Sequence, residues 1–255
     1  MNGYLYETHL HTSQASACGR VQGADYIDYM IDMGYQGMIV TDHFFNGNSC
    51  VPPIPWKERV HWYASGFEQA KKAAANRDFD VFFGVEFNFK GDEYLIYGVD
   101  EKWLCDNEDI MSLSRGQVYE RVKAAGAIMI QAHPYRERGY LSDIRLTPSV
   151  SDGIEIYNAA NRDNENALAY RYAQKLNVPV TAGSDIHYLD PDAMGGMLFP
   201  ERLKNISDFV NAVLQEKGIP VKVEKGRCRP VEEIPAMTVP TALPGFPVFY
   251  EGEPV

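Results

Sequence analysis

Residues 4–11, YLYETHLH, form a strand-like run that ends in two histidines, His9 and His11. Side chains at i and i+2 of an extended strand point to the same side, so both imidazoles can reach one common point. The same pattern, an apolar strand followed at once by a histidine or a carboxylate, recurs at four places: TDHF (His43), FFGVEF (Glu86), QAHPY (His133) and GSDIH (Asp185 and His187). This recurrence carries the predictions of both fold and site.

Strand-like and helix-like segments alternate along the chain. The expected strands are 4–10, 37–41, 81–86, 94–99, 127–132, 153–157, 179–183 and 220–223, and the expected helices are 24–33, 58–75, 117–125, 164–176 and 206–216. Apolar spacing typical of helices marks the second group, and Gly34 ends the first of them. The alternation predicts an α/β fold with a mostly parallel sheet and outer helices, and about seven such strands are enough to close a barrel.

Composition fits one barrel-sized globular domain. The chain has 255 residues, of which 45% are hydrophobic and 23% charged, as in ordinary globular proteins. Its net charge of -11 disfavours broad nucleic-acid binding, because an acidic surface repels a phosphate backbone. No run approaches the roughly 18 apolar residues of a membrane span, so no membrane association is expected.

The cysteines and the N-terminus bear on location. The four cysteines, Cys18, Cys50, Cys105 and Cys228, show no zinc-knuckle spacing and are too few for a disulfide framework. The start MNGYLYETHLH lacks the basic and apolar regions of an export signal. We therefore expect reduced thiols and a cytoplasmic protein. Nothing in the sequence indicates the oligomeric state.

The last part of the chain differs in composition. From about Arg229 onward it is rich in proline, and Phe246, Val248 and Phe249 are its apolar anchors. We expect one domain over residues 1–228, with residues 229–255 as an extended tail that packs on it.

Five of the six histidines lie at the carboxyl ends of four predicted strands, whereas His61 falls inside a helix pattern and is expected to be an ordinary surface residue. The carboxyl ends of parallel strands share one face, where active sites form. Imidazole nitrogen and carboxylate oxygen are ligands of divalent transition metals. The predicted metal ligands are His9, His11, His43, Glu86, His133, Asp185 and His187.

Such a centre predicts hydrolysis. Clustered divalent ions lower the pKa of bound water and yield hydroxide, and a neighbouring ion neutralises charge that develops in an in-line displacement. The chain has no G-x-S-x-G elbow and no P-loop, which disfavours serine acyl transfer and nucleotide-driven chemistry. The hypothesis is attack of metal-bound hydroxide on a small phosphate ester, with Asp185 at the centre and His43 or His187 as proton donor if not metal-bound.

Other residues near the motifs are candidates for support. Arg20 and Arg136 would bind phosphate bidentately, and a surface salt bridge is the alternative for each. Asn158 would hydrogen-bond the substrate or a ligand, or would simply be a turn residue. Asp42, which precedes His43, is expected to orient a metal-bound histidine.

Taken together and in this order, HLHTSQAS, VTDHF, GVEF, IQAHPY and TAGSDIH resemble the polymerase-and-histidinol-phosphatase (PHP) superfamily over about residues 4–200. The resemblance implies a distorted, TIM-barrel-like (β/α)7 barrel that holds two to three divalent ions of manganese, iron or zinc. It implies a first ion on His9, His11, Glu86 and Asp185, a second on Glu86 and His133, and a third on His43 and His187.

The sequence departs from that family at two places. Where many members carry a carboxylate or histidine after the H-x-H, this chain has Ser16, Ala17 and Cys18; Cys18 is either a thiolate ligand suited to zinc or iron or an ordinary loop cysteine. Where many members have a histidine that completes the second site, this chain has GDEYL, so Asp92 or Glu93 substitutes, or the stretch is a solvated acidic turn.

Three other functions remain open from the sequence. They are a PHP-type nuclease or phosphodiesterase, an amidohydrolase-like C–N hydrolase, and a non-catalytic metal-binding domain. The SDIH ending fits the PHP pattern better than the amidohydrolase one, and the sequence does not name the substrate.

Overall fold

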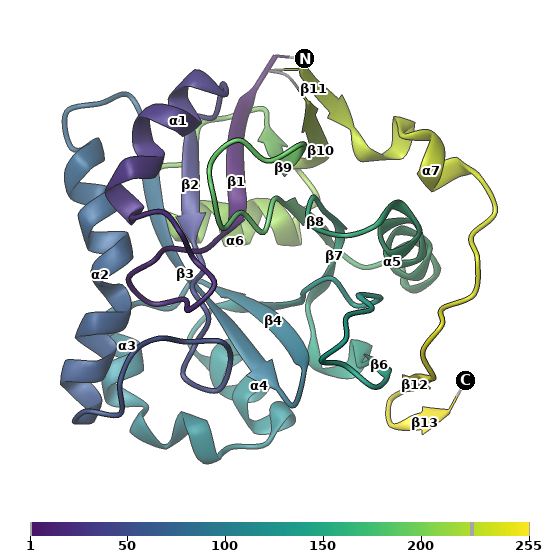
Figure 1. Ribbon diagram of the computed structural model, residues 1–255, viewed down its shortest axis with the longest axis horizontal. Coiled ribbons are helices and arrows are strands. Elements are labelled where there is room, and N and C mark those ends of the chain that lie inside the picture. The colour runs from purple at the N-terminus through teal and green to yellow at the C-terminus, as the bar shows by residue number, and fades with distance from the viewer. Residues whose placement is uncertain (1, 225–226, 255) are drawn as a thin grey trace.

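The computed structural model describes residues 2–224 and 227–254, and it centres on a ten-stranded sheet (Figure 1). Listed in spatial order, its strands are β11 (Arg227–Pro230), β10 (Ile219–Glu224), β9 (Met194–Phe199), β1 (Tyr4–Leu10), β2 (Gly37–Val40), β3 (Asp80–Phe89), β4 (Asp92–Tyr97), β5 (Ile128–Gln131), β7 (Gly153–Asn158) and β8 (Val180–Gly183). A small sheet joins β6 (Ile144–Leu146), β12 (Val248–Tyr250) and β13 (Glu253–Pro254).

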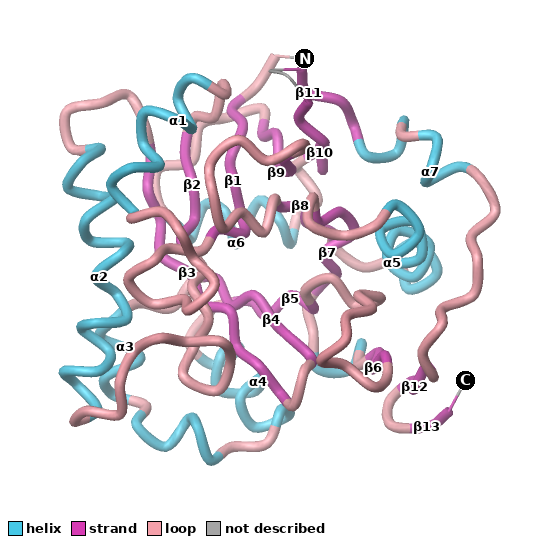
Figure 2. The backbone as a smooth tube through the Cα atoms, viewed as in Figure 1, coloured by secondary structure: helices cyan, strands magenta, loops and turns pink. Residues whose placement is uncertain are grey.

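The helices lie outside the large sheet (Figure 2). They are α1 (Tyr26–Asp32), α2 (Trp56–Ala74), α3 (Glu101–Asp106), α4 (Arg115–Ala124), α5 (Asp163–Leu176), α6 (Ile206–Leu214) and α7 (Pro235–Thr238). Ile27 and Met30 of α1 pack with Met38 and Val40 of β2, which is the apolar face expected from the helical spacing. Burying each such side chain contributes roughly 1.5–3 kcal/mol, so the helices fix the strands that carry the site.

The strand directions confirm part of the expected topology. Strands β1, β2 and β3 are parallel, as are β5, β7 and β8. Between these groups β4 runs antiparallel to both β3 and β5, because Lys90 and Gly91 form a tight hairpin turn with positive φ angles of 56° and 104°. The fold is therefore mixed α/β, and seven β/α units are not confirmed.

The sheet curls so that its two parts approach each other. The amide of His11 donates to Ile186 O at 3.0 Å, and the amide of Ile186 donates to His9 O at 3.3 Å. These bonds bring the segment after β8 beside the carboxyl end of β1. At the other end of β1, residues 4–6 pair with β9 instead. The curled sheet thus collects the carboxyl ends of β1, β2, β3, β5 and β8 in one place.

The tail runs down the side of the molecule that carries α5 (Figure 1). Its short helix α7 buries Met237 in the same cluster as Ala173 of α5. Further on, the amides of Gly245 and Phe246 donate to the Glu137 carboxylate, and β12 pairs in parallel with β6. The tail therefore contacts the loop that follows His133.

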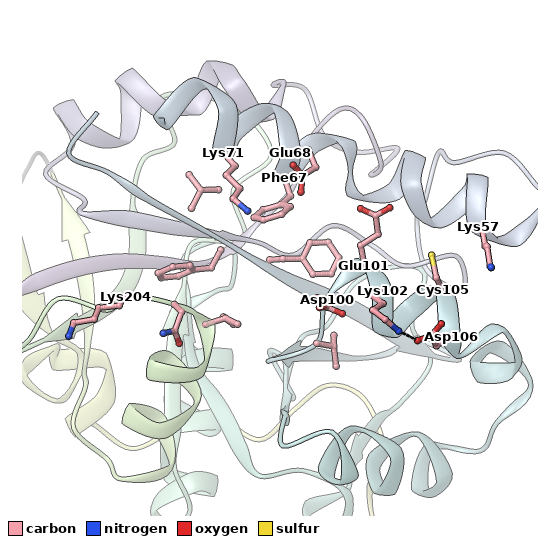
Figure 3. Close-up of a pocket in the computed structure, with 16 residues that line it drawn as sticks. Lys57, Phe67, Glu68, Lys71, Asp100, Glu101, Lys102, Cys105, Asp106 and Lys204 are labelled. Atoms are coloured by element: carbon pink, nitrogen blue, oxygen red, sulfur yellow. Dashed lines mark hydrogen bonds and ion pairs between the residues drawn. The ribbon is translucent and has the colours of Figure 1, made fainter. Parts of the chain in front are cut away.

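One surface cavity lies away from the predicted site. A surface cavity of about 820 Å³ opens beside α2 and α3, with Phe67, Phe82 and Lys71 among its lining residues (Figure 3). None of its lining residues belongs to the predicted metal ligands.

Among the described residues, no helix combines the length and the apolar character needed to cross a membrane.

Candidate metal centre

All seven predicted ligands gather where the strands end. His9 lies in β1 and Glu86 in β3, while the others directly follow or lie just beyond the ends of β1, β2, β5 and β8. Six of the seven are buried, with at most 8% of the residue surface exposed: His9, His11, His43, Glu86, His133 and Asp185. Only His187 is partly exposed, at 22% of its side chain. Residues up to 178 positions apart in the chain therefore share one buried pocket.

The first group joins two histidines and two carboxylates. His9 Nε2 lies 3.1 Å from Glu86 Oε1 and 3.5 Å from Asp185 Oδ1. His11 Nε2 lies 3.0 Å from Asp185 Oδ1 and 3.5 Å from Glu86 Oε2. Atoms that share one ion at bond lengths of about 2.0–2.2 Å lie roughly 3–3.5 Å from one another in tetrahedral geometry, so these spacings suit a common cation.

Several of these atoms lie close to opposite charges and still lack a well-aligned hydrogen bond. His9 Nε2, His11 Nε2, His43 Nδ1 and Glu86 Oε2 are buried and form no hydrogen bond with any described residue. A buried polar atom without a partner costs about 1–3 kcal/mol, and more when it is charged. Four such atoms around one pocket fit a centre that binds cations.

The second group involves the acidic hairpin strand. His133 Nε2 lies 3.2 Å from Glu86 Oε1 and 3.5 Å from Glu93 Oε2, and Glu93 Oε1 lies 3.6 Å from His43 Nδ1. Asp92 instead forms an ion pair with Arg115 on the other side of β4. Of the two acids considered from the sequence, Glu93 is therefore the one that reaches the centre.

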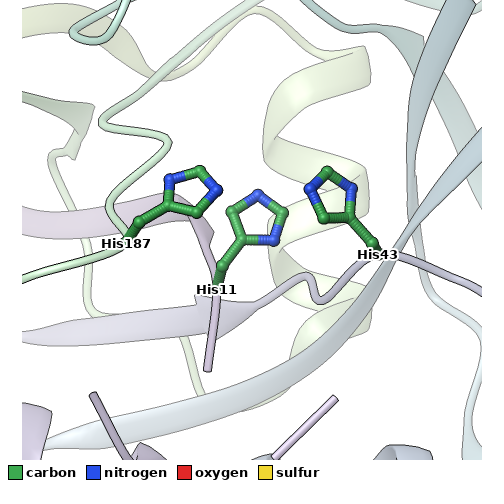
Figure 4. A group of neighbouring side chains, drawn as sticks. All are labelled: His11, His43 and His187. Atoms are coloured by element: carbon green, nitrogen blue, oxygen red, sulfur yellow. The ribbon is translucent and has the colours of Figure 1, made fainter. Parts of the chain in front are cut away.

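The third group consists of His11, His43 and His187 (Figure 4). The ring of His11 is 4.3 Å from that of His43 and 4.4 Å from that of His187, measured between centroids. Nδ1 of His187 is 2.7 Å from Asp185 O, so this nitrogen donates to the carbonyl and Nε2 is left for another partner. Cys18 lines the same cavity as His187.

Glu155 orients two of the histidines, and the sequence analysis missed it. Its Oε1 lies 2.9 Å from His9 Nδ1, while Oε2 accepts from the amide of His133 at 3.0 Å. A carboxylate on Nδ1 fixes the tautomer of His9 so that Nε2 faces the centre. The available signal was an acid inside GIEIY, an otherwise apolar strand that is buried throughout.

Asp42 orients His11 indirectly, through the hydroxyl group of Ser16. Ser16 Oγ donates to Asp42 Oδ1 at 2.6 Å and lies 3.1 Å from His11 Nδ1. Because its proton is used for Asp42, Ser16 accepts from His11 Nδ1, which leaves Nε2 of His11 free for the centre. The amide and the hydroxyl of Thr12 both donate to the Asp42 carboxylate, which holds its position.

Of the three predicted substrate-binding residues, Arg136 and Asn158 contact Asp185, whereas Arg20 lies at the surface. Arg136 Nη2 donates to Asp185 Oδ2 at 2.6 Å and to Asn158 Oδ1 at 3.0 Å. Asn158 Nδ2 in turn donates to Glu155 at 3.1 Å and to Asp185 at 3.3 Å. Arg20 is exposed and lines a cavity of about 570 Å³ beside Cys18, His187 and Tyr188.

The electrostatics of the pocket favour charged carboxylates. Burial opposes ionisation of Glu86, but the charges of His43 and His9 outweigh it and hold the Glu86 pKa well below its ordinary value. Asp185 is likewise depressed in pKa, by His9 and Arg136 against burial. Burial lowers the pKa of His11, and the neighbouring His43 lowers it further. Ionised acids and a neutral imidazole are the forms that bind metal, whereas the neighbouring carboxylates raise the pKa of His9 and of His43, so a metal ion would displace their protons.

Two of the site residues adopt left-handed backbone conformations. His133 has φ of 28° and Asp185 has φ of 55°, in a region that non-glycine residues rarely occupy. Such strain costs of order 1–3 kcal/mol per residue and concentrates at functional sites. In both places the conformation ends the strand and turns the side chain into the pocket.

Comparison with known proteins gives one family and a set of solved structures. A family model described as PHP-associated matches residues 163–217. A two-domain protein from Bacteroides vulgatus that contains a predicted PHP-like metal-dependent phosphoesterase superposes with a TM-score of 0.64 at 15% identity, over 86% of this chain and 64% of that one. This chain thus spans less than two thirds of that protein's length.

A second structure, from Bifidobacterium adolescentis and predicted to be a metal-dependent phosphoesterase, has a TM-score of 0.51 at 15% identity. The match covers 82% of this chain and 95% of that one. No significant match is found among curated proteins. At these identities the likeness concerns the fold.

Proposed function

We propose that this chain is a metal-dependent phosphoesterase of small phosphorylated molecules. The PHP-associated match at residues 163–217 bears out the predicted resemblance to the PHP superfamily, and the likeness in fold to two solved structures supports the proposal. The observation that carries the proposal is the set of buried, unpartnered nitrogen and oxygen atoms that face one another at the strand ends. Carboxylates and imidazoles that could hold divalent ions, beside a cavity, suit metal-assisted hydrolysis of a phosphate ester.

The pocket suits two to three divalent ions of manganese, iron or zinc. We assign the first to His9, His11, Glu86 and Asp185, the second to Glu86, His133 and Glu93, and the third to His43 and His187. When bound, such ions supply an activated water and neutralise charge on the phosphoryl oxygens. Glu86, with one oxygen near His9 and the other near His43, would bridge the sites.

The remaining residues divide into those that face the substrate and those that hold the centre. Arg20 lines the cavity beside His187 and would bind the phosphate. Either His43 or His187, when it holds no ion, would donate a proton to the leaving oxygen. Arg136 and Asn158 already use their polar atoms on Asp185 and on each other, so we propose that they fix Asp185.

The wider organisation is proposed on the same basis. The curled sheet would be a variant of the PHP barrel, with residues 1–228 as the hydrolase domain and the tail as an appendage packed on it. The net charge of -11 favours a small substrate over a nucleic acid, because a protein surface that binds a nucleic acid is usually basic. A cytoplasmic location stays a prediction.

The test is metal-dependent release of phosphate. Chelator-treated protein reloaded with manganese, iron or zinc should release inorganic phosphate from members of a phosphomonoester panel. His9→Ala and Asp185→Ala should lose both bound metal and activity. His61→Ala is the matched control, because this exposed histidine pairs only with the surface acid Glu101 among described residues, and it should keep both.

The proposal fails if the metal-loaded protein releases no phosphate from any ester and the His9→Ala variant binds as much metal as the parent. Cleavage of labelled oligonucleotides, in the absence of phosphomonoesterase activity, would favour the nuclease function instead. Hydrolysis of a cyclic amide would favour an amidohydrolase.

A further inference from the structure

The cavity beside α2 and α3 has the size of a small-molecule site. Its volume of about 820 Å³ falls in the range of roughly 300–1,000 Å³ that is usual for ligand pockets. Its walls come from α2, the start of β3, the segment that leads into α3, and the start of α6. A molecule bound there would contact the start of β3, whereas Glu86 of the proposed metal centre lies further along that strand.

The floor of this cavity is apolar and already ordered. The ring of Phe67 meets the ring of Phe83 edge-on, with centroids 5.4 Å apart, and Phe82 stacks on Tyr6 at 6.0 Å. Phe83 and Val99 are buried, with 7% and 3% of their surface exposed. Because neighbouring side chains fix these rings, a ligand that packs on them loses little free energy in ordering the protein.

Charged side chains surround this floor. They are four lysines and four acids: Lys57, Lys71, Lys102, Lys204, Glu68, Asp100, Glu101 and Asp106. Three of the acids have partners within the protein. Asp100 caps the first turn of α3, Glu101 Oε1 lies 3.1 Å from His61 Nδ1, and Asp106 pairs with Lys102. Most of the negative charge at the rim is therefore engaged.

The positive charge is not engaged in the same way. The ammonium groups of Lys57, Lys71 and Lys204 form no ion pair and no hydrogen bond with any described residue. Lys71 Nζ lies 5.2 Å from the centroid of the Phe67 ring, and Figure 3 shows this amine beside that ring in the cavity. A cation held against apolar surface pairs more strongly with an anion than a cation in bulk water does, because the local dielectric constant is lower.

We propose that this cavity binds a small organic anion, an apolar or aromatic body that carries one carboxylate. The body would pack on Phe67, Phe82 and Val81, and the carboxylate would pair with Lys71. Glu68, one turn before Lys71 on α2, is the one acid of the rim without a partner among the described residues. It would disfavour ligands with a second negative charge. The inference does not depend on the proposed phosphoesterase activity.

Three matched probes test the charge of the ligand. They are 2-naphthoate, its neutral amide 2-naphthamide, and the cationic 2-naphthylmethylamine, each titrated into metal-free protein so that no bound ion competes for the carboxylate. Calorimetry measures affinity, and backbone amide shifts in NMR locate the probe. We expect 2-naphthoate to bind one site, to shift the amides of residues 67–71 and 81–83, and to bind at least about tenfold more tightly than the amide, as one charge-assisted contact requires.

Substitutions locate the cation. Lys71→Met keeps the apolar stem and removes the charge, so it should weaken 2-naphthoate by at least about tenfold and leave 2-naphthamide unchanged. Lys72→Met is the matched control, because Lys72 is exposed on the same helix and does not line the cavity, and it should bind both probes as the parent does. Glu68→Gln should bind 2-naphthoate no more weakly than the parent.

Several results would overturn the inference. Equal affinity for all three probes, or tightest binding of the amine, would show that the cavity does not select an anion. Equal loss in Lys71→Met and Lys72→Met would remove the role of Lys71. Amide shifts confined to the strand ends around His187 would assign the anion to the proposed metal centre. Failure to release phosphate from any ester bears only on the proposed function, since none of these readouts involves turnover.

Discussion

Arg136 Nη2 lies 2.6 Å from Asp185 Oδ2, and neither side chain is more than 10% exposed. This buried ion pair links the loop after β5 to Asp185, the proposed ligand after β8, and Asn158 contacts both partners. The guanidinium helps to keep Asp185 ionised, which is the form that binds a cation.

We expect Arg136→Ala to destabilise the metal-free protein by about 3–5 kcal/mol, because the change leaves Asp185 buried without its partner. Metal should recover much of this loss, since a bound cation compensates the same carboxylate. Urea unfolding with and without zinc measures both effects. Lys102→Ala, which breaks an exposed pair with Asp106, should cost far less, because water screens such a pair; equal losses in the two variants would contradict the prediction.

Glu155→Gln should weaken metal binding by roughly 10–100-fold, because the amide no longer holds His9 in the required tautomer with a full negative charge. A competition titration against a chelating dye measures the affinity. The surface pair of His61 and Glu101, whose Nδ1–Oε1 distance is 3.1 Å, gives the control. Unchanged affinity in Glu155→Gln, or a similar loss in Glu101→Gln, would show that the buried carboxylate has no special role.

Asp92 should make stability fall as pH rises. Burial raises its pKa from 3.8 to about 6, and the charge of Arg115 offsets only part of this effect. Between these values the folded state holds a proton that the unfolded state releases, so the unfolding free energy declines with pH through this window, by about 3 kcal/mol in all. Above about pH 6 no further change comes from this group.

Urea unfolding of the metal-free parent and of Asp92→Asn, compared at steps from about pH 4 to 7, measures the difference. The parent should lose stability relative to the variant across the window. A constant difference between the two proteins at every pH would show that Asp92 ionises in the folded state as it does in the unfolded one.

Removing residues 244–255 should loosen the loop that carries Arg136. Glu137 would lose the amides of Gly245 and Phe246, and the amide of Ile144 would lose its acceptor, Pro247 O. Hydrogen exchange should therefore accelerate over residues 137–149. Helix α2, at the opposite edge of the molecule from the tail in Figure 1, is the internal control, and uniform acceleration in both places would indicate general destabilisation instead.

Much of the strand framework could be predicted because each strand is an apolar run with a clear end. Strand β1 begins and ends at the predicted residues Tyr4 and Leu10. Strand β9, MGGMLF, was not predicted, since paired glycines usually indicate a turn. In the structure Gly195 and Gly196 allow close approach of neighbouring strands, as a Cβ at either would overlap the carbonyl of Gly183 or Tyr6.

The residues of the candidate site could also be predicted only in part. Histidines and acids at strand ends could be located from local pattern alone, because the topology brings those ends together. Glu93 was left open against Asp92, since the alternation of side chains along β4 depends on a register that only pairing with β3 fixes. Glu155 lies mid-strand, and its role depends on the ring of His9, which is 146 residues away in the chain.

The left-handed turns at His133 and Asp185 restrict how this protein could have diverged. A residue inserted on the strand side of either position would move the side chain off the backbone conformation that directs it inward. Length changes are therefore tolerable only beyond these points, in the loops that begin near Pro134 and Tyr188. Relatives that act on different substrates should vary in exactly those loops while the spacing from each strand to its last ligand stays constant.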